Sequence, residues 1–140
     1  MIRKRTRAIT KILSKNDTGE TGAHQAGILV PKPEEILSFF PELDSSVKNP
    51  RLAITFIDDT GSKWQFSFIY YNNKFFDGTR NEYRLTRMTP FFKSHNLKSG
   101  DTLTLEHNGE GEYNISYVRV NEVRDGDVLH LGTSWKVINI

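Results

Sequence analysis

Two polar segments of this chain carry the side chains that can read the edges of DNA bases. Residues 14–27 form a glycine-punctuated stretch between two apolar runs, and residues 72–87 form a second polar stretch. The candidate base readers are His24 and Gln25 in the first segment and Arg80, Glu82 and Arg84 in the second. Arginine can bridge O6 and N7 of guanine, glutamate can accept from the amino group of cytosine, and glutamine can pair with adenine. The two segments therefore predict sequence-specific DNA binding, with the Arg-x-Glu-x-Arg ladder covering consecutive G·C pairs.

Basic and amide side chains around these readers are typical of phosphate contacts or of loop support. Lysine and arginine bind the DNA backbone whatever its sequence, and such contacts fix the position of a protein on the duplex. We expect one of these two roles for Arg3, Lys4, Arg5, Arg7, Lys15, Asn16, Asn73, Lys74, Thr79, Asn81, Tyr83 and Arg87.

The distribution of charge supports an anionic ligand. The formal net charge is +2, but residues 1–27 hold six basic and two acidic side chains, and residues 72–87 hold four basic and two acidic ones. The remaining residues therefore carry a net charge of −4. A mildly acidic protein with two basic segments directs an anion such as DNA toward those segments.

Each of these features also has a plainer interpretation. The basic residues 3–7 are also what a solvated, flexible terminus would contain. Glu82 can form a local ion pair with Arg80 or Arg84, and such a pair could also hold the arginines rigid for reading. His24, taken alone, is most simply an ordinary loop histidine. These alternatives stay open at the level of the sequence.

Length and composition limit the class of protein. A chain of 140 residues forms one domain and can bury roughly two-thirds of the surface that it exposes when unfolded. It contains no cysteine, which excludes disulfides, cysteine nucleophiles and thiolate metal sites. No apolar run approaches the roughly 20 residues of a membrane span, and no signal-peptide segment follows the basic start. We expect a cytoplasmic protein of a bacterium or archaeon, without cofactor or metal.

The remaining chain is organised into short strands. Alternating patterns predict strands over residues 8–13, 28–31, 51–57, 63–71, 102–107 and 112–120, and one or two closing strands within 128–131 and 135–140. The glycine-containing turn 58–62 joins two of them as a hairpin. In the strand 63–71, an aromatic stripe falls on one face and is expected in the core; its members are Trp64, Phe66, Phe68 and Tyr70.

Two short helices complete the expected fold. The first covers residues 33–40, with Pro33 as its first helical residue and acidic side chains in its first turn. The second begins with Thr89 as cap, followed by Pro90. Some seven strands with two short helices indicate a mainly β protein that forms a closed or nearly closed barrel.

The two polar segments resemble a known family. Four stretches resemble the N-terminal effector-binding domain of EcoRII-type restriction endonucleases: Lys15-Asn16-Asp17-Thr18-Gly19, residues 21–27, Tyr70-Tyr71-Asn72-Asn73 and residues 78–86. A wider pattern resembles the DNA-binding pseudobarrel of plant transcription factors. It consists of Tyr83-Arg84-Leu85-Thr86, Phe91-Phe92, residues 97–101 and Leu103. The resemblance extends from about residue 11 to residue 107.

The resemblance implies a single seven-stranded pseudobarrel domain over residues 1–140. An N-arm, residues 14–27, and a C-arm, residues 72–87, would enter the major groove of duplex DNA. The readers carried over from the family are His24 on the N-arm and Arg80, Glu82 and Arg84 on the C-arm. The family's target is a CC(A/T)GG site, but Gly78 and Tyr83 stand where its best-known member has lysines, so the target of this chain is left open.

In that family the domain acts as the effector or targeting part of a type IIE-like restriction enzyme and regulates cleavage allosterically. The nuclease domain would then lie outside these residues, because no lysine here has an acid two positions before it, as the Asp…(Asp/Glu)-x-Lys cleavage core requires. We therefore expect no catalytic residue, a monomeric isolated domain and duplex DNA as partner. Two alternatives are a stand-alone, transcription-factor-like DNA-binding protein and a small-ligand barrel lined by Trp64, Trp135 and tyrosines.

Overall fold

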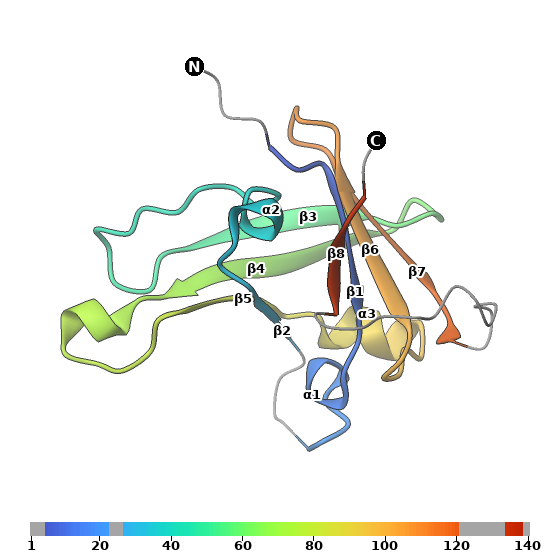
Figure 1. Cartoon of the computed structure of the whole chain (residues 1–140). Helices are drawn as coiled ribbons and strands as arrows, with labels where there is room; N and C mark the ends of the chain where they lie inside the picture. Colours follow the sequence, from blue (N-terminus) through green and yellow to red (C-terminus); the bar gives the residue numbers. More distant parts are fainter. Residues whose placement is uncertain (1–4, 23–26, 121–133, 139–140) are drawn as a thin grey trace.

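The computed structural model describes residues 5–22, 27–120 and 134–138, and its strands form one curled sheet around a single core (Figure 1). The strand order is β2-β5-β4-β3-β7-β6-β1-β8. The strands are β1 (Ala8–Ile12), β2 (Ile28–Val30), β3 (Arg51–Ile57), β4 (Lys63–Tyr71), β5 (Glu82–Thr86), β6 (Thr102–His107), β7 (Tyr113–Val118) and β8 (Trp135–Val137). The helical segments are α1 (Lys15–Thr18), α2 (Glu34–Leu37), the 3-10 turn η1 (Asn73–Phe76) and α3 (Thr89–Ser94).

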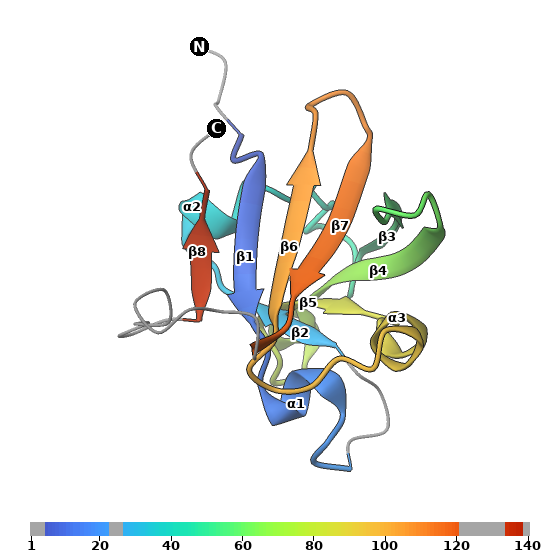
Figure 2. The same ribbon diagram turned by 90° about the vertical axis from the view of Figure 1, so that its right-hand side faces the viewer.

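Neighbouring strands pair antiparallel except β3 and β7, which are parallel where Phe56 lies opposite Tyr113. Figure 2 shows β8, β1, β6 and β7 side by side in front, with β2 and β5 behind them. The two edge strands, β2 and β8, approach each other. Nε1 of Trp135 in β8 donates a hydrogen bond to the carbonyl oxygen of Leu29 in β2 at 3.3 Å. The sheet is therefore a curled, partly closed barrel, and the mainly β barrel architecture predicted from the sequence is confirmed.

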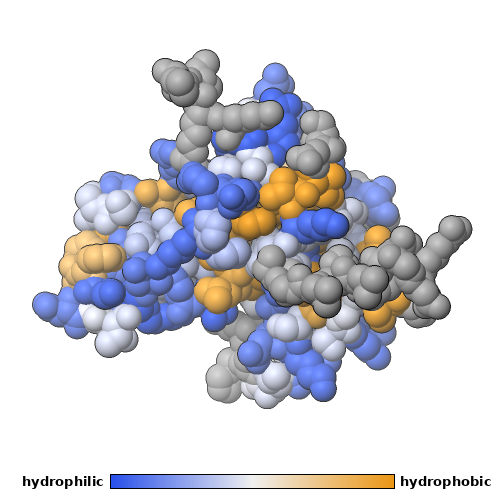
Figure 3. Space-filling model, in the orientation of Figure 1, coloured by the Kyte–Doolittle hydropathy of each residue, from blue (hydrophilic) through white to orange (hydrophobic). Residues whose placement is uncertain are grey.

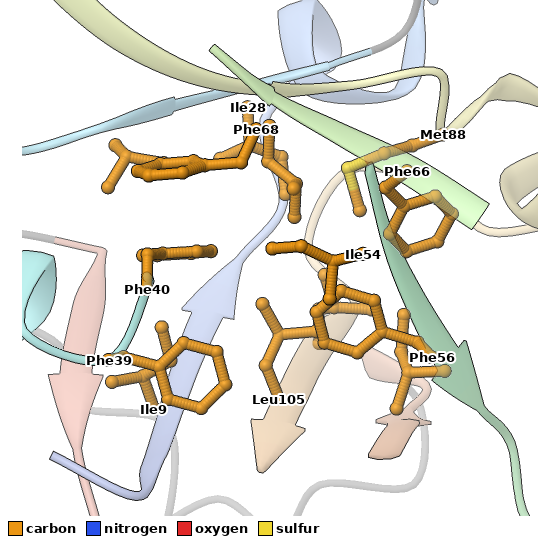
Figure 4. Close-up of a cluster of buried hydrophobic side chains, with 14 of the residues drawn as sticks. Ile9, Ile28, Phe39, Phe40, Ile54, Phe56, Phe66, Phe68, Met88 and Leu105 are labelled. Atoms are coloured by element: carbon orange, nitrogen blue, oxygen red, sulfur yellow. The ribbon is translucent and has the colours of Figure 1, made fainter. Parts of the chain in front are cut away.

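Aromatic side chains fill the inside of the curl (Figure 4). Phe66 and Phe68 of β4 are each 1% exposed, and Trp64 and Tyr70 on the same face are half-buried, so the core role predicted for this stripe is confirmed. Phe39 and Phe40, directly after α2, turn inward from the opposite side, and the Phe40 ring stacks on Phe68 at 4.5 Å between centroids. Burial of these rings is the main force that holds the two sides of the sheet together.

Several expected boundaries differ from the structure. The described residues contain eight strands, because residues 82–86 of the C-arm form β5 and not loop. The first helix ends at Leu37, since Phe39 and Phe40 point into the core, and Pro33 is its N-cap residue. In α3 the N-cap is Met88, so Thr89 and Pro90 occupy the first two helical positions. The possible strand over residues 128–131 lies outside the described residues.

None of the helices in the described ranges is long and apolar enough to cross a membrane.

His107, at the end of β6, gives the fold a pH-dependent contact. It is 5% exposed; its Nδ1 accepts from the Gly109 N–H at 3.0 Å, so its Nε2, 2.8 Å from the Thr6 carbonyl oxygen, is the donor. Burial lowers the pKa of His107 below its ordinary value of 6.5; the hydrogen bond to Thr6 opposes this shift, while the charges of Arg5 and Arg7 add to it. The neutral ring is therefore the form that fits the folded protein.

We expect the free energy of unfolding to fall as the pH drops below 6.5, the ordinary pKa of this group, because the unfolded chain then binds a proton that the folded one resists. Above that pH, His107 should contribute no pH dependence. Urea unfolding at pH 7.5 and pH 5.5 measures the difference, with His107→Gln as the matched variant. A variant whose stability changes as much between the two pH values as that of the parent would show that another group is responsible.

Candidate nucleic-acid interface

The two arms leave the sheet at opposite ends of β5. At its first residue, β5 pairs with the last residue of β4, Glu82 opposite Tyr71, and the loop 72–81 connects these two strands. At its other end, β5 pairs with the first residue of β2, Leu85 opposite Ile28, directly after the N-arm. Figure 1 shows loop 72–81 at the left and α1 of the N-arm at the bottom, with β5 and β2 between them. The outer face of β5 therefore lies between the arms.

Three of the predicted readers lie together on this face. Arg84 meets Glu82 through its Nε at 2.6 Å from Oε2, and Arg80 meets the same carboxylate through its Nε at 3.5 Å from Oε1. Their side chains are 42% (Arg80), 29% (Glu82) and 37% (Arg84) exposed. Both contacts use the Nε atom, so Glu82 does not occupy the terminal nitrogens of either guanidinium group.

Glu82 is thus ion-paired in the unbound protein. Its partial burial would raise its pKa, but the hydrogen bond and charge of Arg84, and then those of Arg80, outweigh burial and lower the pKa of Glu82. The carboxylate stays ionised and holds the two arginine heads at one point. We call Arg80, Glu82 and Arg84 the charged ladder.

The alternate residues of β5 face inward and support the charged ladder from behind. Leu85 is fully buried, and Tyr83 stacks on Tyr70 at 4.1 Å and on Phe68 at 5.7 Å between ring centroids. Burial raises the pKa of the Tyr83 phenol, followed by the effects of Tyr70 and Glu34. Tyr83 therefore supports the arm from the core side, away from the charged ladder.

Three asparagines organise the loop 72–81. Asn72 is 1% exposed; its Nδ2 donates to the carbonyl oxygens of Ser45 (3.2 Å) and Val47 (2.9 Å), and its Oδ1 accepts from the Asn49 N–H (2.7 Å). Asn73 accepts the Arg80 N–H at 2.6 Å through Oδ1, and Asn81 accepts the Tyr70 hydroxyl at 2.7 Å. These contacts give the loop a defined shape without a ligand.

Gly78, one of the two departures from the family pattern, packs against this framework. A Cβ atom at this position would lie 2.6 Å from Cγ of Asn73, closer than side-chain atoms approach one another. A lysine at position 78 would therefore require the Asn73 side chain to shift from this position. Lys74 and Thr79 are exposed on the same loop, and Arg87 is exposed beyond the other end of β5 with φ +65°.

The N-arm is anchored by its short helix. Ser14 caps α1, and Asp17 accepts the Ser14 N–H at 2.9 Å and pairs with Lys11 of β1 at 2.9 Å. Beyond the helix, Glu20 accepts the N–H of Ser99 at 2.7 Å, which ties the arm to the turn before β6. Lys15 and Asn16 are exposed, and Asn16 accepts the hydroxyl of Thr21. His24 and Gln25, the predicted readers of this arm, lie outside the described residues.

Arg5 and Arg7 are not brought to the charged ladder. Arg5 donates to the carbonyl oxygens of Phe39 (2.8 Å) and Ser38 (3.2 Å) and to the Tyr113 hydroxyl (3.2 Å). It precedes β1, whose far end leads into α1, so it lies across the molecule from the N-arm helix (Figure 1). The exposed Arg7 lies near Gly109 at this same end. Arg3 and Lys4 lie outside the described residues.

The surface around the C-arm is polar. In Figure 3, the left half of the view, where loop 72–81 lies, is mainly hydrophilic. Exposed apolar side chains on it include Phe75 (66%) and Phe76 (37%) on the loop, and Leu29 (48%), which lies opposite Arg84 in the register of β2 and β5. Trp64 and Trp135, proposed from sequence as a pocket lining, instead pack inward: Trp64 meets Phe91 edge-on at 5.2 Å between centroids, and Trp135 is 7% exposed.

Comparisons with known proteins agree with this geometry. Residues 3–125 match the model of the family described as "Restriction endonuclease EcoRII, N-terminal". The type II restriction enzyme EcoRII of Escherichia coli is 36% identical over 98 residues, which cover 68% of this chain and 24% of that enzyme. The chain thus spans about a quarter of the length of this relative.

A solved structure shares the fold. The protein of an Arabidopsis FUS3–DNA complex superimposes with a TM-score of 0.61 at 20% sequence identity, covering 79% of this chain and 94% of that one. At this identity the match shows the fold alone, a pseudobarrel with few short helices. The pseudobarrel architecture inferred from the sequence is confirmed.

Proposed function

This chain belongs to the family of EcoRII N-terminal domains, and on that premise we propose that it binds duplex DNA sequence-specifically across the outer face of β5. The observation that carries the proposal is the charged ladder. It presents two arginines and a carboxylate, partly exposed and bonded to one another; Glu82 and Arg84 lie on β5, which is paired on both sides, and Arg80 lies just before it. That side-chain set fits the O6 and N7 acceptors of guanine and the amino donor of cytosine in the major groove.

The compact ladder favours neighbouring base pairs. The guanidinium groups of Arg80 and Arg84 both contact the Glu82 carboxylate, so the two groups lie close together although they come from positions four residues apart. The charged ladder therefore reads adjacent G·C pairs, and a CC(A/T)GG-like site would provide such pairs. On the N-arm, His24 and Gln25 read further bases.

Contacts around the ladder divide into phosphate binding and support. Lys15, Asn16, Lys74, Thr79 and Arg87 are exposed at the arms and contact the DNA backbone. Asn73, Asn81 and Tyr83 hold the C-arm in shape. Arg5 and Arg7 are left out of the interface, because they lie at the other end of β1.

At the level of the whole protein, residues 1–140 act as one effector or targeting module of a type IIE-like restriction enzyme. The relative is about four times longer than the part matched here, which leaves room for a nuclease domain that this module controls allosterically. No catalytic step is assigned to the module itself. It works as a monomer when isolated, in the cytoplasm of a bacterium or archaeon. The alternative is a stand-alone regulator that uses the same surface.

Selection of bound sequences from a random duplex library tests the DNA-binding proposal. We expect enrichment of one short site, and tighter binding of its duplex than of either single strand at equal salt, because only paired bases present fixed groove edges. Fluorescence anisotropy with the selected site, its separate strands and a scrambled duplex gives the comparison. Equal affinity for single strands would indicate a base-stacking surface instead, and no enrichment at all would overturn the proposal that the domain reads sequence.

A further inference from the structure

We infer that Tyr71 is a positioning residue that holds the Arg80 side chain ready to read a base, an inference that rests on the proposed function. Tyr71 ends β4 and lies opposite Glu82 in the register of the sheet. The Cζ atom of Arg80 lies 3.7 Å from the centroid of the Tyr71 ring. A guanidinium group this close to an aromatic face is held by a cation–π contact.

Arg80 needs such a contact more than Arg84 does. Arg84 belongs to β5 and meets Glu82 at 2.6 Å, whereas Arg80 precedes the strand and its distance to Glu82 is 3.5 Å. The Arg80 side chain is also 42% exposed, so Glu82 alone would hold it weakly. The Tyr71 ring supplies a second point of attachment.

The backbone of Arg80 is fixed independently. Its N–H donates to Oδ1 of Asn73 at 2.6 Å, and its carbonyl oxygen accepts the Lys74 N–H at 2.9 Å. With the backbone held by the loop and the side chain by Tyr71 and Glu82, little conformational freedom remains to be lost on binding.

The position of Arg80 over the ring also keeps it competent to bind. The N–H donors of a guanidinium group lie in its plane, so a ring against its flat face leaves those donors available. Tyr71 can therefore orient Arg80 without using the donors that a guanine requires.

The test compares Tyr71→Leu and Tyr71→Val, which remove the ring, with Tyr71→Phe, which keeps it and removes only the hydroxyl. Competition binding is measured against duplexes that vary one base pair at a time. At the base pair whose preference Arg80→Ala erodes, the two ring-free variants should lose preference roughly two- to fivefold, the range of an exposed cation–π contact. Tyr71→Phe should keep the preference at that base pair, and the affinity of all three variants for random duplex should not change.

A double variant separates positioning from other roles. If Tyr71 acts through Arg80, Tyr71→Leu should have no further effect at that base pair once Arg80 is alanine. Additive losses would overturn the inference, as would a loss spread equally over all base pairs or parental preference in both ring-free variants. If Arg80→Ala itself changes no preference, the proposed function of the charged ladder fails, which is a different result from failure of Tyr71 alone.

Discussion

Replacing Asp17 with alanine is expected to lower the free energy of unfolding by about 3 to 5 kcal/mol, the cost of removing one partner of a buried ion pair. Asp17 is 6% exposed and Lys11 is 8% exposed, and the Lys11 Nζ lies 2.9 Å from Oδ2 of Asp17. Without the carboxylate, a buried ammonium group keeps the carbonyl oxygen of Ile12, at 3.3 Å, and the Trp135 ring, whose centroid is 6.0 Å away. The same carboxylate accepts the N–H of Ser14, so the cap of α1 is weakened as well.

Urea unfolding followed by circular dichroism measures the loss. Two variants separate the buried charge from the cap: Ser14→Ala should cost about 1 kcal/mol, as capping residues do, and Lys11→Met with Asp17→Ala should recover most of the stability by removing the stranded charge. A double variant as unstable as Asp17→Ala alone would place the whole effect in the capping box. Since α1 begins the N-arm, either result shows how the arm is attached to β1.

The strands with a regular alternation could be predicted from the sequence. The expected bounds 51–57, 63–71 and 102–107 are those of β3, β4 and β6. In these strands an apolar face meets one continuous core, so the period of two is strong. The turn between β3 and β4 carried its own signal, because Gly61 has a φ of +86° that favours glycine.

β5 was missed although its sequence has the same period. Glu82 and Arg84 alternate with Tyr83 and Leu85, which is a charged face against an apolar one. Charged residues at this density are also typical of a DNA-reading loop, so the alternation alone does not distinguish a strand from a loop here. The four-residue helix α1 is too short to show a helical period. The sequence signal for it is Ser14 followed three residues later by Asp17, which together form a capping box.

Contacts between distant residues could not be predicted. Tyr71 faces Arg80 because of the register between β4 and β5, which the sequence does not state. Arg5 was expected to bind phosphate on its charge alone, whereas three oxygens from α2's C-terminal side and from β7 hold its guanidinium group. Charge and residue type identified the charged ladder, but its internal bonding and its supports depend on the tertiary fold.

Glu82→Ala is expected to reduce discrimination between DNA sequences while raising affinity for random duplex. Glu82 contacts both arginines, so its removal frees two readers and also deletes an acceptor for cytosine. We expect a loss of about 1 to 3 kcal/mol of discrimination at each base pair that depends on these contacts. Random duplex should bind more tightly, because one negative charge no longer opposes the phosphates.

Binding of the selected site, its single-base-pair variants and a random duplex, each at two salt concentrations, measures both effects. Glu82→Gln is the matched control: it removes the charge but keeps an acceptor for one arginine, so it should raise random binding as alanine does and retain part of the preference. Arg84→Ala should lose preference without the gain in random affinity, since it removes a positive charge. If Glu82→Ala keeps the parental site preference and lowers only the melting temperature, Glu82 is a structural partner of the two arginines, and the reading role of the carboxylate is wrong.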